Sequence, residues 1–199
     1  MVYLSVKGTK GVFMAKDDRD IKGTYVTALL ELCKSKPLKK ITVGDVLSEA
    51  GTARQTFYNY FRDINDLIAY VHISALEENH PPFCPPDASE DAFRFMLEHK
   101  EFYRQLPHHE GQNCFRDSYL AWLRQNYYEV AFKNIPVGSE EYLRRKALVD
   151  AYLYGNVDLF MEWCKSGLEW PIEALMAVIY ETSPDFILDE MLPDFKAPR

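Results

Sequence analysis

Apolar residues recur at helical spacing along most of the chain, and the first such run spans residues 18–35. One face of this predicted helix carries a continuous apolar stripe, made of Ile21, Tyr25, Ala28, Leu29 and Leu32. Pro37 cannot continue a helix, so the residues around it form a link to the next element.

The second predicted helix has sequence signals at both ends. Thr42 is a good N-cap, and Asp45 stands three residues later, where it completes a capping box. Ile41 and Val46 have the spacing of a hydrophobic staple, which fixes the direction of the chain at the helix start. Gly51 suits the left-handed conformation that ends many helices. These signals predict a short helix between the N-cap and the glycine.

A third helix is predicted over residues 53–60 and a fourth from Asp63 to about residue 78. The third helix turns Phe57, Tyr60 and Phe61 toward the core and leaves a polar cluster outside, made of Arg54, Gln55, Thr56, Tyr58 and Asn59. Two short helices joined by a tight glycine turn are the layout of a DNA-reading helix-turn-helix. The same layout also occurs in plain helical hairpins, in which such polar residues form only a solvated face.

Prolines crowd the segment HPPFCPP (80–86), so it is predicted to be a loop. The remaining helices are predicted at about 88–106, 112–133, 139–166, 171–182 and 184–191, and no strand pattern of any length is present. The sequence therefore predicts an all-α protein with an N-terminal arm (1–17), a three-helix helix-turn-helix domain (18–62) and a C-terminal helical domain (63–199).

The composition agrees with a folded chain that has a substantial core, since 47% of its 199 residues are apolar and 13 Tyr and 12 Phe are present. No apolar run is long enough to span a bilayer and the N-terminus lacks the pattern of a secretion signal, so a cytoplasmic protein is expected. Residues 1–72 carry 11 Lys or Arg against 8 Asp or Glu, whereas residues 73–199 carry 12 against 22. A mildly basic head on an acidic body fits a protein that contacts DNA phosphates with one end only.

Each side chain of the predicted helix-turn-helix suits a particular contact with DNA. Arg54 pairs well with guanine and Gln55 with adenine, so these two are the candidates for reading base edges. The N-terminus of the second helix presents amides that favour a phosphate. The candidates for contacts to the DNA backbone are Lys39, Lys40, Thr42, Thr56, Tyr58, Asn59 and Arg62, and Thr56 is also a candidate for a thymine methyl.

Residues 41–67, ITVGDVLSEAGTARQTFYNYFRDINDL, resemble the reading head of the TetR/AcrR family of bacterial regulators. The family signature T-F-Y-x-Y-F is matched in register from Thr56 to Phe61, and the upstream stretch PLKKITV (37–43) also matches. Segments 148–167 and 171–179 resemble the last two long helices of the family. This resemblance implies a homodimer through helices near 141–166 and 171–182, with two heads on a palindromic double-stranded operator. It also implies that residues 63–199 serve both dimerisation and effector binding.

The chain departs from the family pattern at the start of the reading helix. Ala53 stands where Ser is common, so either Thr52 caps the helix or the helix starts loosely. Gln55 replaces a small residue, which makes it a candidate specificity determinant. Ile64 stands where a phosphate-contacting Lys is common, so one backbone contact is expected to be missing.

The resemblance further implies a pocket in the body for an unknown small-molecule effector. Stripes of aromatic residues on the middle helices have the chemistry for an apolar cavity, with the lining expected near Met96, Tyr103, Tyr119, Trp122, Tyr152 and Asn156. The alternative is that these aromatic residues are ordinary core.

No residues with catalytic spacing are found: the chain has no Gly-rich phosphate loop and no nucleophile elbow, so an enzyme is not expected. No metal site or cofactor is expected, because the four cysteines are scattered and His99, His108 and His109 form no i, i+4 pair, which indicates surface histidines at a helix end. The resemblance to the TetR/AcrR family implies a dimeric repressor that a small-molecule effector releases. The alternative is a regulator or activator controlled by a protein partner.

Overall fold

The computed structural model describes residues 16–79 and 90–192, and every regular element in these two segments is a helix. In chain order the elements are α1 (Lys16–Cys33), the 3-10 turn η1 (Leu38–Lys40), α2 (Val43–Ala50), α3 (Arg54–Tyr58), α4 (Ile64–Asn79), α5 (Glu90–Glu98), α6 (Lys100–Tyr103), the 3-10 turn η3 (Leu106–His108), α7 (Phe115–Ala131), α8 (Glu140–Lys165), α9 (Ile172–Glu181) and α10 (Asp185–Met191). The predicted all-α fold is confirmed. Most of the expected arm and the proline-rich loop with Cys84 lie outside the described residues.

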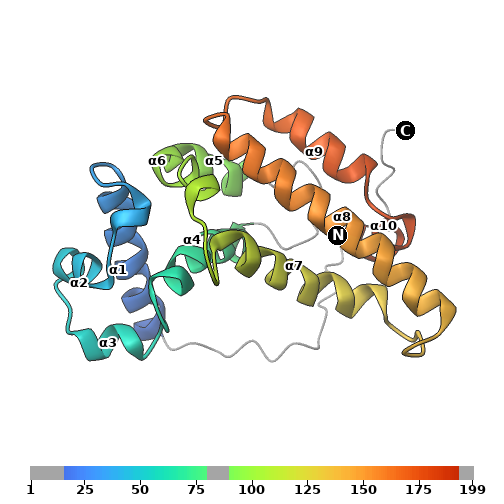
Figure 1. Ribbon diagram of the computed structural model, residues 1–199, viewed down its shortest axis with the longest axis horizontal. Helices are drawn as coiled ribbons and strands as arrows, with labels where there is room; N and C mark the ends of the chain where they lie inside the picture. The colour runs from blue at the N-terminus through green and yellow to red at the C-terminus, as the bar shows by residue number, and fades with distance from the viewer. Residues whose placement is uncertain (1–15, 80–89, 193–199) are drawn as a thin grey trace.

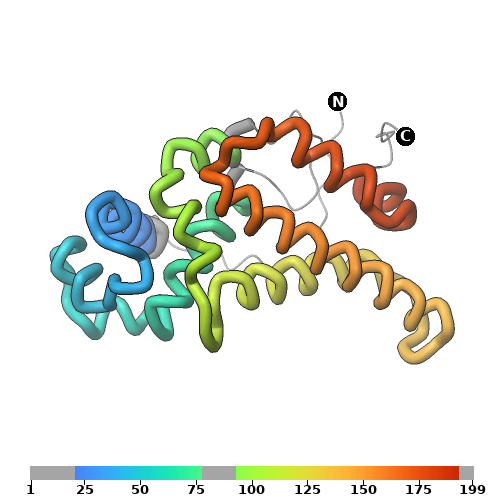
Figure 2. The backbone as a smooth tube through the Cα atoms, turned by 45° about the horizontal axis from the view of Figure 1, so that its top comes forward, coloured from blue at the N-terminus to red at the C-terminus, as the bar shows by residue number. Residues whose placement is uncertain are grey.

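The helices form a small head and a larger body (Figure 1). The head contains α1, α2 and α3, and α4 leads from α3 into the body. In the body α7 and α8 pack against each other, and α9 lies alongside α8 in both views (Figures 1 and 2). α5 and α6 lie between the head and α8, and α6 packs against α1 of the head.

The start and end of α2 follow the sequence signals. The Thr42 side chain accepts a hydrogen bond of 3.2 Å from the Asp45 amide, and the Asp45 carboxylate accepts one of 2.7 Å from the Thr42 amide, which is a complete capping box. Gly51 ends the helix with φ 64° and ψ 33°, in the left-handed region. Ile41 and Val46 are both buried, as a hydrophobic staple requires. The predicted ends of α2 are confirmed.

The third helix is shorter than the predicted span of 53–60. Ala53 is the N-cap and makes no side-chain capping hydrogen bond. The Thr52 hydroxyl instead donates to the Tyr25 hydroxyl at 3.0 Å, because the fully buried Tyr25 needs a polar partner. Of the two expected alternatives, Thr52 does not cap the helix, and α3 begins without a side-chain cap, as the second alternative expects.

The first body helix, predicted as one span at 88–106, is divided into α5, α6 and η3. The break falls at His99, whose backbone (φ −109°, ψ 31°) leaves the helical region. It allows Phe102, Tyr103 and Leu106 to turn into the core, where all three are fully buried or nearly so. No Pro or Gly marks this break, so helical periodicity alone joins the two sides. The later helices begin and end within three residues of their predicted limits.

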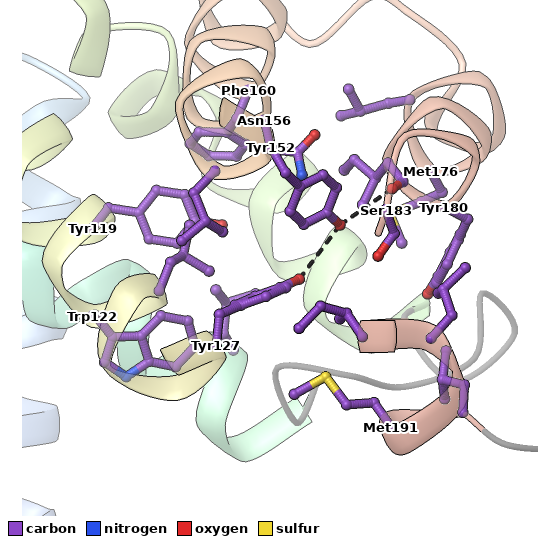
Figure 3. A pocket seen from close by; sticks show the side chains of 18 of the residues that line it. Tyr119, Trp122, Tyr127, Tyr152, Asn156, Phe160, Met176, Tyr180, Ser183 and Met191 are labelled. Atoms are coloured by element: carbon purple, nitrogen blue, oxygen red, sulfur yellow. Dashed lines mark hydrogen bonds between the residues drawn. The ribbon is translucent and has the colours of Figure 1, made fainter. Parts of the chain in front are cut away.

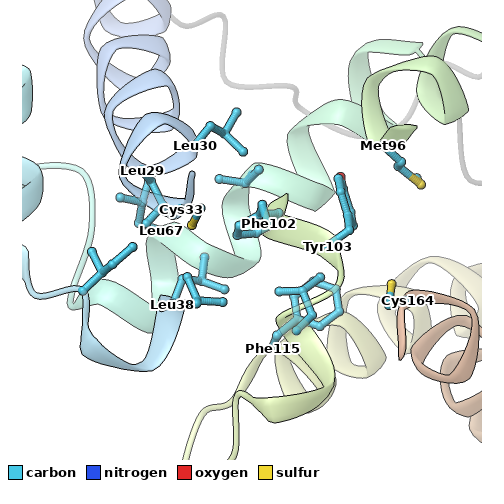
Figure 4. Packing of buried hydrophobic residues seen from close by; sticks show 14 of the residues in the cluster. Leu29, Leu30, Cys33, Leu38, Leu67, Met96, Phe102, Tyr103, Phe115 and Cys164 are labelled. Carbon is cyan, nitrogen blue, oxygen red and sulfur yellow. The ribbon is translucent and has the colours of Figure 1, made fainter. Parts of the chain in front are cut away.

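One buried cluster runs without interruption from the head into the body. It contains Leu29 and Leu38 of the head, Leu67 of α4, and Phe102 and Phe115 of the body (Figure 4). This cluster crosses the predicted domain boundary between residues 62 and 63. The head is therefore not a separately sealed unit, and its core is completed by the body.

The Gln105 side chain fixes the junction between the head and the body. Its Oε1 accepts from the Leu38 amide at 2.6 Å, while its Nε2 donates to the Cys33 carbonyl at 3.4 Å and to the Glu101 carbonyl at 2.6 Å. Cys33 ends α1 and Leu38 begins η1, so one amide side chain holds both ends of the α1–η1 link.

Replacing Thr42 with Ala is expected to destabilise the chain by about 1 kcal/mol, because the N-cap of α2 loses its side-chain acceptor. Chemical denaturation followed by helical circular dichroism measures this loss. Thr42→Ser is the matched control and should retain most of the stability, since its hydroxyl can form the same cap. Equal destabilisation by both substitutions would contradict a role for the capping box.

Candidate functional site

The short helix α3 presents a polar surface because Phe57 anchors its other side. Phe57 is fully buried and packs edge-to-face against Tyr25, with ring centroids 5.3 Å apart. Arg54 and Gln55 lie on the first turn and are exposed. The anchored aromatic thus directs the two predicted base-reading side chains to solvent on the leading turn of the helix.

Both of these side chains are held by residues one turn later. Arg54 Nη2 donates to the Tyr58 hydroxyl at 3.3 Å, and its guanidinium carbon lies 5.5 Å from the centre of the Tyr58 ring. Gln55 Nε2 lies 3.5 Å from Asn59 Oδ1. Such i, i+4 pairs orient the side chains, but both contacts are long, so a binding partner can replace them. Thr56, half-buried, completes the predicted set on this helix.

Two exposed lysines lie beside the start of α2. Some of the backbone amides at this helix terminus already donate hydrogen bonds in the capping box. Lys39 and Lys40 lie in η1 and are exposed. The Thr42 hydroxyl, predicted to meet a phosphate, donates to Asp45 Oδ2 at 2.7 Å, and Lys36 pairs with the same oxygen at 2.6 Å. Hydrogen bonds from Lys36 and Thr42 lower the pKa of Asp45 to about 2, so this carboxylate stays ionised. A phosphate arriving here would rely mainly on the two lysines.

Arg62 lies just before α4, and its side chain is 80% exposed. Its Nη2 pairs with Asp66 Oδ1 at 3.2 Å, and its amide donates to Asp66 Oδ2 at 3.0 Å. Burial acts to raise the pKa of Asp66, but these hydrogen bonds hold it below its ordinary value. Asp66 thus partly neutralises the positive charge of Arg62. The positive charges of Lys39 and Lys40 are less compensated than that of Arg62.

A cavity of about 110 Å³ lies in the body among α4, α5, α7, α8, α9 and α10 (Figure 3). Five of the six residues predicted for the pocket line it, namely Met96, Tyr119, Trp122, Tyr152 and Asn156. The sixth, Tyr103, is fully buried outside the lining, where its hydroxyl lies 3.4 Å from His72 Nδ1. The structure therefore gathers most of the predicted pocket residues around one space.

One end of the cavity is polar. Tyr152 donates to the Ile179 carbonyl at 3.2 Å, and the Tyr127 hydroxyl lies 3.4 Å from that of Tyr152 (Figure 3). Burial raises the pKa of Tyr152, which the neighbouring Tyr127, Ser183 and Asn156 partly offset. Sequence reasoning did not select Tyr127 or Ser183. Tyr127 was part of an aromatic stripe, but Ser183 follows α9 with no local signal.

Comparison with known families shows the family of the chain. The family model described as "Transcriptional regulator C-terminal region", of the TetR type, matches residues 85–185, which is half of the chain. The chain belongs to the TetR family of transcriptional regulators. A search of curated proteins found no match.

One histidine of this TetR-family chain, His109, has a structural role. His108 is exposed, as expected for a surface residue, but the expectation for His109 is wrong because this side chain is half-buried. The Phe115 amide donates to His109 Nδ1 at 3.1 Å, so Nε2 carries the proton and donates to Asn65 Oδ1 at 3.0 Å. His109 thus joins the start of α7 to α4 in place of a side-chain cap.

The two segments that the structure describes give little support to a metal site, a membrane-spanning helix or a reactive thiol. Within them no group of three His, Cys, Asp or Glu side chains is placed to hold a metal ion, and no helix has the length and apolarity to cross a membrane. Cys33 and Cys164 are buried free thiols, and burial raises the pKa of Cys33 to about 12. Such thiols are poor nucleophiles.

Acidification is expected to weaken this TetR-family chain through His109. Burial lowers the pKa of His109 below its ordinary value of 6.5, so the unfolded chain takes up the proton first. The stabilisation is therefore present above about pH 6.5 and is lost as the pH falls toward the folded pKa. Unfolding free energies measured at about pH 7.5 and about pH 5.5 should fall less in His109→Gln than in the wild type. His108→Gln is the matched control and should keep the wild-type pH dependence; an unchanged slope in His109→Gln would contradict the assignment.

Proposed function

We propose that this chain is a sequence-specific DNA-binding transcriptional regulator, a dimeric repressor that a small-molecule effector releases from its operator. Residues 18–62 form the reading head and residues 63–199 the effector-binding and dimerisation domain, with residues 1–17 as an arm. The observation that carries this proposal is the leading turn of α3, where Arg54 and Gln55 are exposed and held in place over a buried aromatic anchor. The protein acts in the cytoplasm, where such regulators meet their operators.

The reading head places α3 in the major groove with its N-terminal turn first. Arg54 then faces a guanine edge and Gln55 an adenine edge, and each leaves its partner on the next turn, Tyr58 or Asn59, free to contact a phosphate. Thr56 lies between the bases and the backbone. The change of partner costs little, because the intramolecular hydrogen bonds at 3.3 and 3.5 Å are long.

Phosphate contacts fix the register of the head on the duplex. Lys39 and Lys40 reach the backbone beside the start of α2, and Arg62 reaches it beside α4 while still paired with Asp66. Thr42 contributes to phosphate binding because it lies next to the backbone amides of Val43 and Gly44. The capping box does not use these two amides, so they can donate to a phosphate.

Dimerisation uses an apolar face that α8 and α9 expose. On α8, Leu143, Leu148 and Tyr154 are 59%, 40% and 43% exposed, and on α9 Val178 is 42% exposed. Exposed Ala151 lies between the large residues, so a partner helix can approach closely. Pairing these exposed apolar side chains with their copies by a two-fold axis buries them and presents two heads to a palindromic operator. Sedimentation of the full chain at monomer mass alone would contradict this.

The cavity among the body helices favours a small-molecule effector over a protein partner as the signal. α4 begins beside Arg62 of the head and supplies His72 and Leu76 to the cavity wall. An occupant that moves α4 therefore moves the head, and a change in the separation of the two heads releases a palindromic operator. No cofactor and no catalytic step are part of this proposal.

Arg54→Ala and Gln55→Ala are each expected to lose sequence discrimination, by roughly 1–3 kcal/mol per base contact. Electrophoretic shifts with the DNA upstream of the chain's own coding region, against random competitor and at two salt concentrations, measure this. The wild type should form a complex that resists competitor, and the two variants should bind target and random DNA alike.

Arg104→Ala is the matched control, since it also removes one exposed arginine, here from the end of α6 in the body and away from the proposed dimer face. It should bind as the wild type does. Wild-type discrimination in both head variants would contradict the reading roles of Arg54 and Gln55.

A further inference from the structure

We propose that the body cavity binds a small, uncharged aromatic molecule that carries one hydroxyl group, of the monocyclic phenol class. This inference rests on the proposed function, which makes the cavity the effector site, and adds the chemistry of the effector. Four features of the cavity lead to it: the charge of its wall, its aromatic surfaces, its size and its single polar end.

The wall of the cavity contains no charged side chain among the described residues: no Lys, Arg, Asp or Glu lines it. The nearby Glu77 is exposed and lies outside the lining, where it accepts from Trp122 Nε1 at 3.1 Å. A carboxylate or an ammonium group moved into this space would lose its hydration without gaining a counter-ion, which is costly. The occupant is therefore neutral.

Aromatic rings form one side of the cavity and leave flat surfaces for a ring. The ring centroids of His72 and Tyr119 lie 4.5 Å apart, and those of Tyr119 and Phe160 lie 5.6 Å apart, both in edge-to-face contact. Trp122 stacks on Tyr119 at 6.2 Å. Figure 3 shows Tyr119, Trp122 and Phe160 along one side of the space, opposite the side chains of α9 and α10. A planar guest gains both stacked and edge contacts here, which an aliphatic guest does not.

The size of the space limits the guest to a single ring. Its volume of about 110 Å³ is comparable to apolar protein cavities that bind one benzene molecule. Met176 and Met191 line the side opposite the rings, and their flexible thioethers can adjust to a substituent. A polycyclic compound would need the surrounding helices to separate.

The polar end fits one hydroxyl group. Tyr152 and Asn156 lie one turn apart on α8, and Ser183 faces them from the end of α9 (Figure 3). Burial raises the pKa of Tyr127 and of Tyr152, so both phenols stay protonated at neutral pH. Hydroxyl groups and one amide supply both donors and acceptors, which a guest hydroxyl can match because it also donates and accepts.

Calorimetric titration of the full chain with four probes tests this chemistry: phenol, toluene, benzoate and benzylammonium. All four carry one benzene ring, so the series isolates the polar substituent and the charge. Phenol is expected to bind more tightly than toluene, and the two ions are expected to bind far more weakly than either. Absence of phenol binding, or tighter binding of either ion, would overturn the proposal.

Two substitutions test the polar end without changing its shape much. Tyr152→Phe and Asn156→Leu should each weaken phenol binding roughly fivefold to tenfold, the value of about one hydrogen bond, and leave toluene binding unchanged or tighter. Tyr142→Phe removes a hydroxyl from the same helix outside the cavity and should change neither affinity. A phenol-to-toluene ratio equal to that of the wild type in both cavity variants would overturn the assignment, whereas a merely structural effect would weaken both ligands together.

DNA binding measured on the same samples separates the test of the effector chemistry from the test of the proposed function. Operator binding without phenol binding would overturn the effector chemistry alone. Phenol binding without any operator binding would support the cavity assignment and count against the proposed function. Circular dichroism checks that each variant is folded. If Tyr152→Phe does not fold, Asn156→Leu is a sufficient test on its own.

Discussion

The contact on which this structure most depends is the three-way hydrogen bonding of Gln105, which joins the backbone at both ends of the α1–η1 link to α6 of the body. Around it, one apolar cluster passes from Leu29 in the head to Phe102 in the body (Figure 4). Because a buried core resists continuous deformation, the head moves together with the segment that carries Gln105. The position of the reading helix is thus set by the body as well as by its own three helices.

This constraint gives the cavity two physical connections to the head. α4 begins two residues after Arg62, beside α3, and carries His72 in the cavity wall. α5 contributes Met96 to the same wall, and the chain continues through α6 to Gln105 and so to η1 with its exposed lysines. In the function proposed above, an occupant that shifts either helix changes the geometry of the surface that contacts DNA. In that proposal the cavity selects its occupant by shape and one polar group, and the head selects its operator by hydrogen bonds.

The parts of the fold that could be predicted are those with local signals. Thr42, Asp45 and Gly51 define both ends of α2, because capping and left-handed backbone depend on neighbouring residues only. The break at His99 and the capture of the Thr52 hydroxyl by Tyr25 depend on contacts distant in sequence, which periodicity does not contain. The same holds for the site: residue type points to Arg54 and Tyr152, but the role of Gln105 and the place of Ser183 exist only once the helices have packed.

The central claim is that a two-fold pair of reading heads recognises a specific operator. Selection of bound sequences from a pool of random double-stranded DNA by the full chain tests this most directly. The account predicts enrichment of one inverted repeat, with half-sites separated by about one helical turn of DNA or a small multiple of it. Recovery of sequences with no shared motif, or of a single unrepeated site, would contradict it.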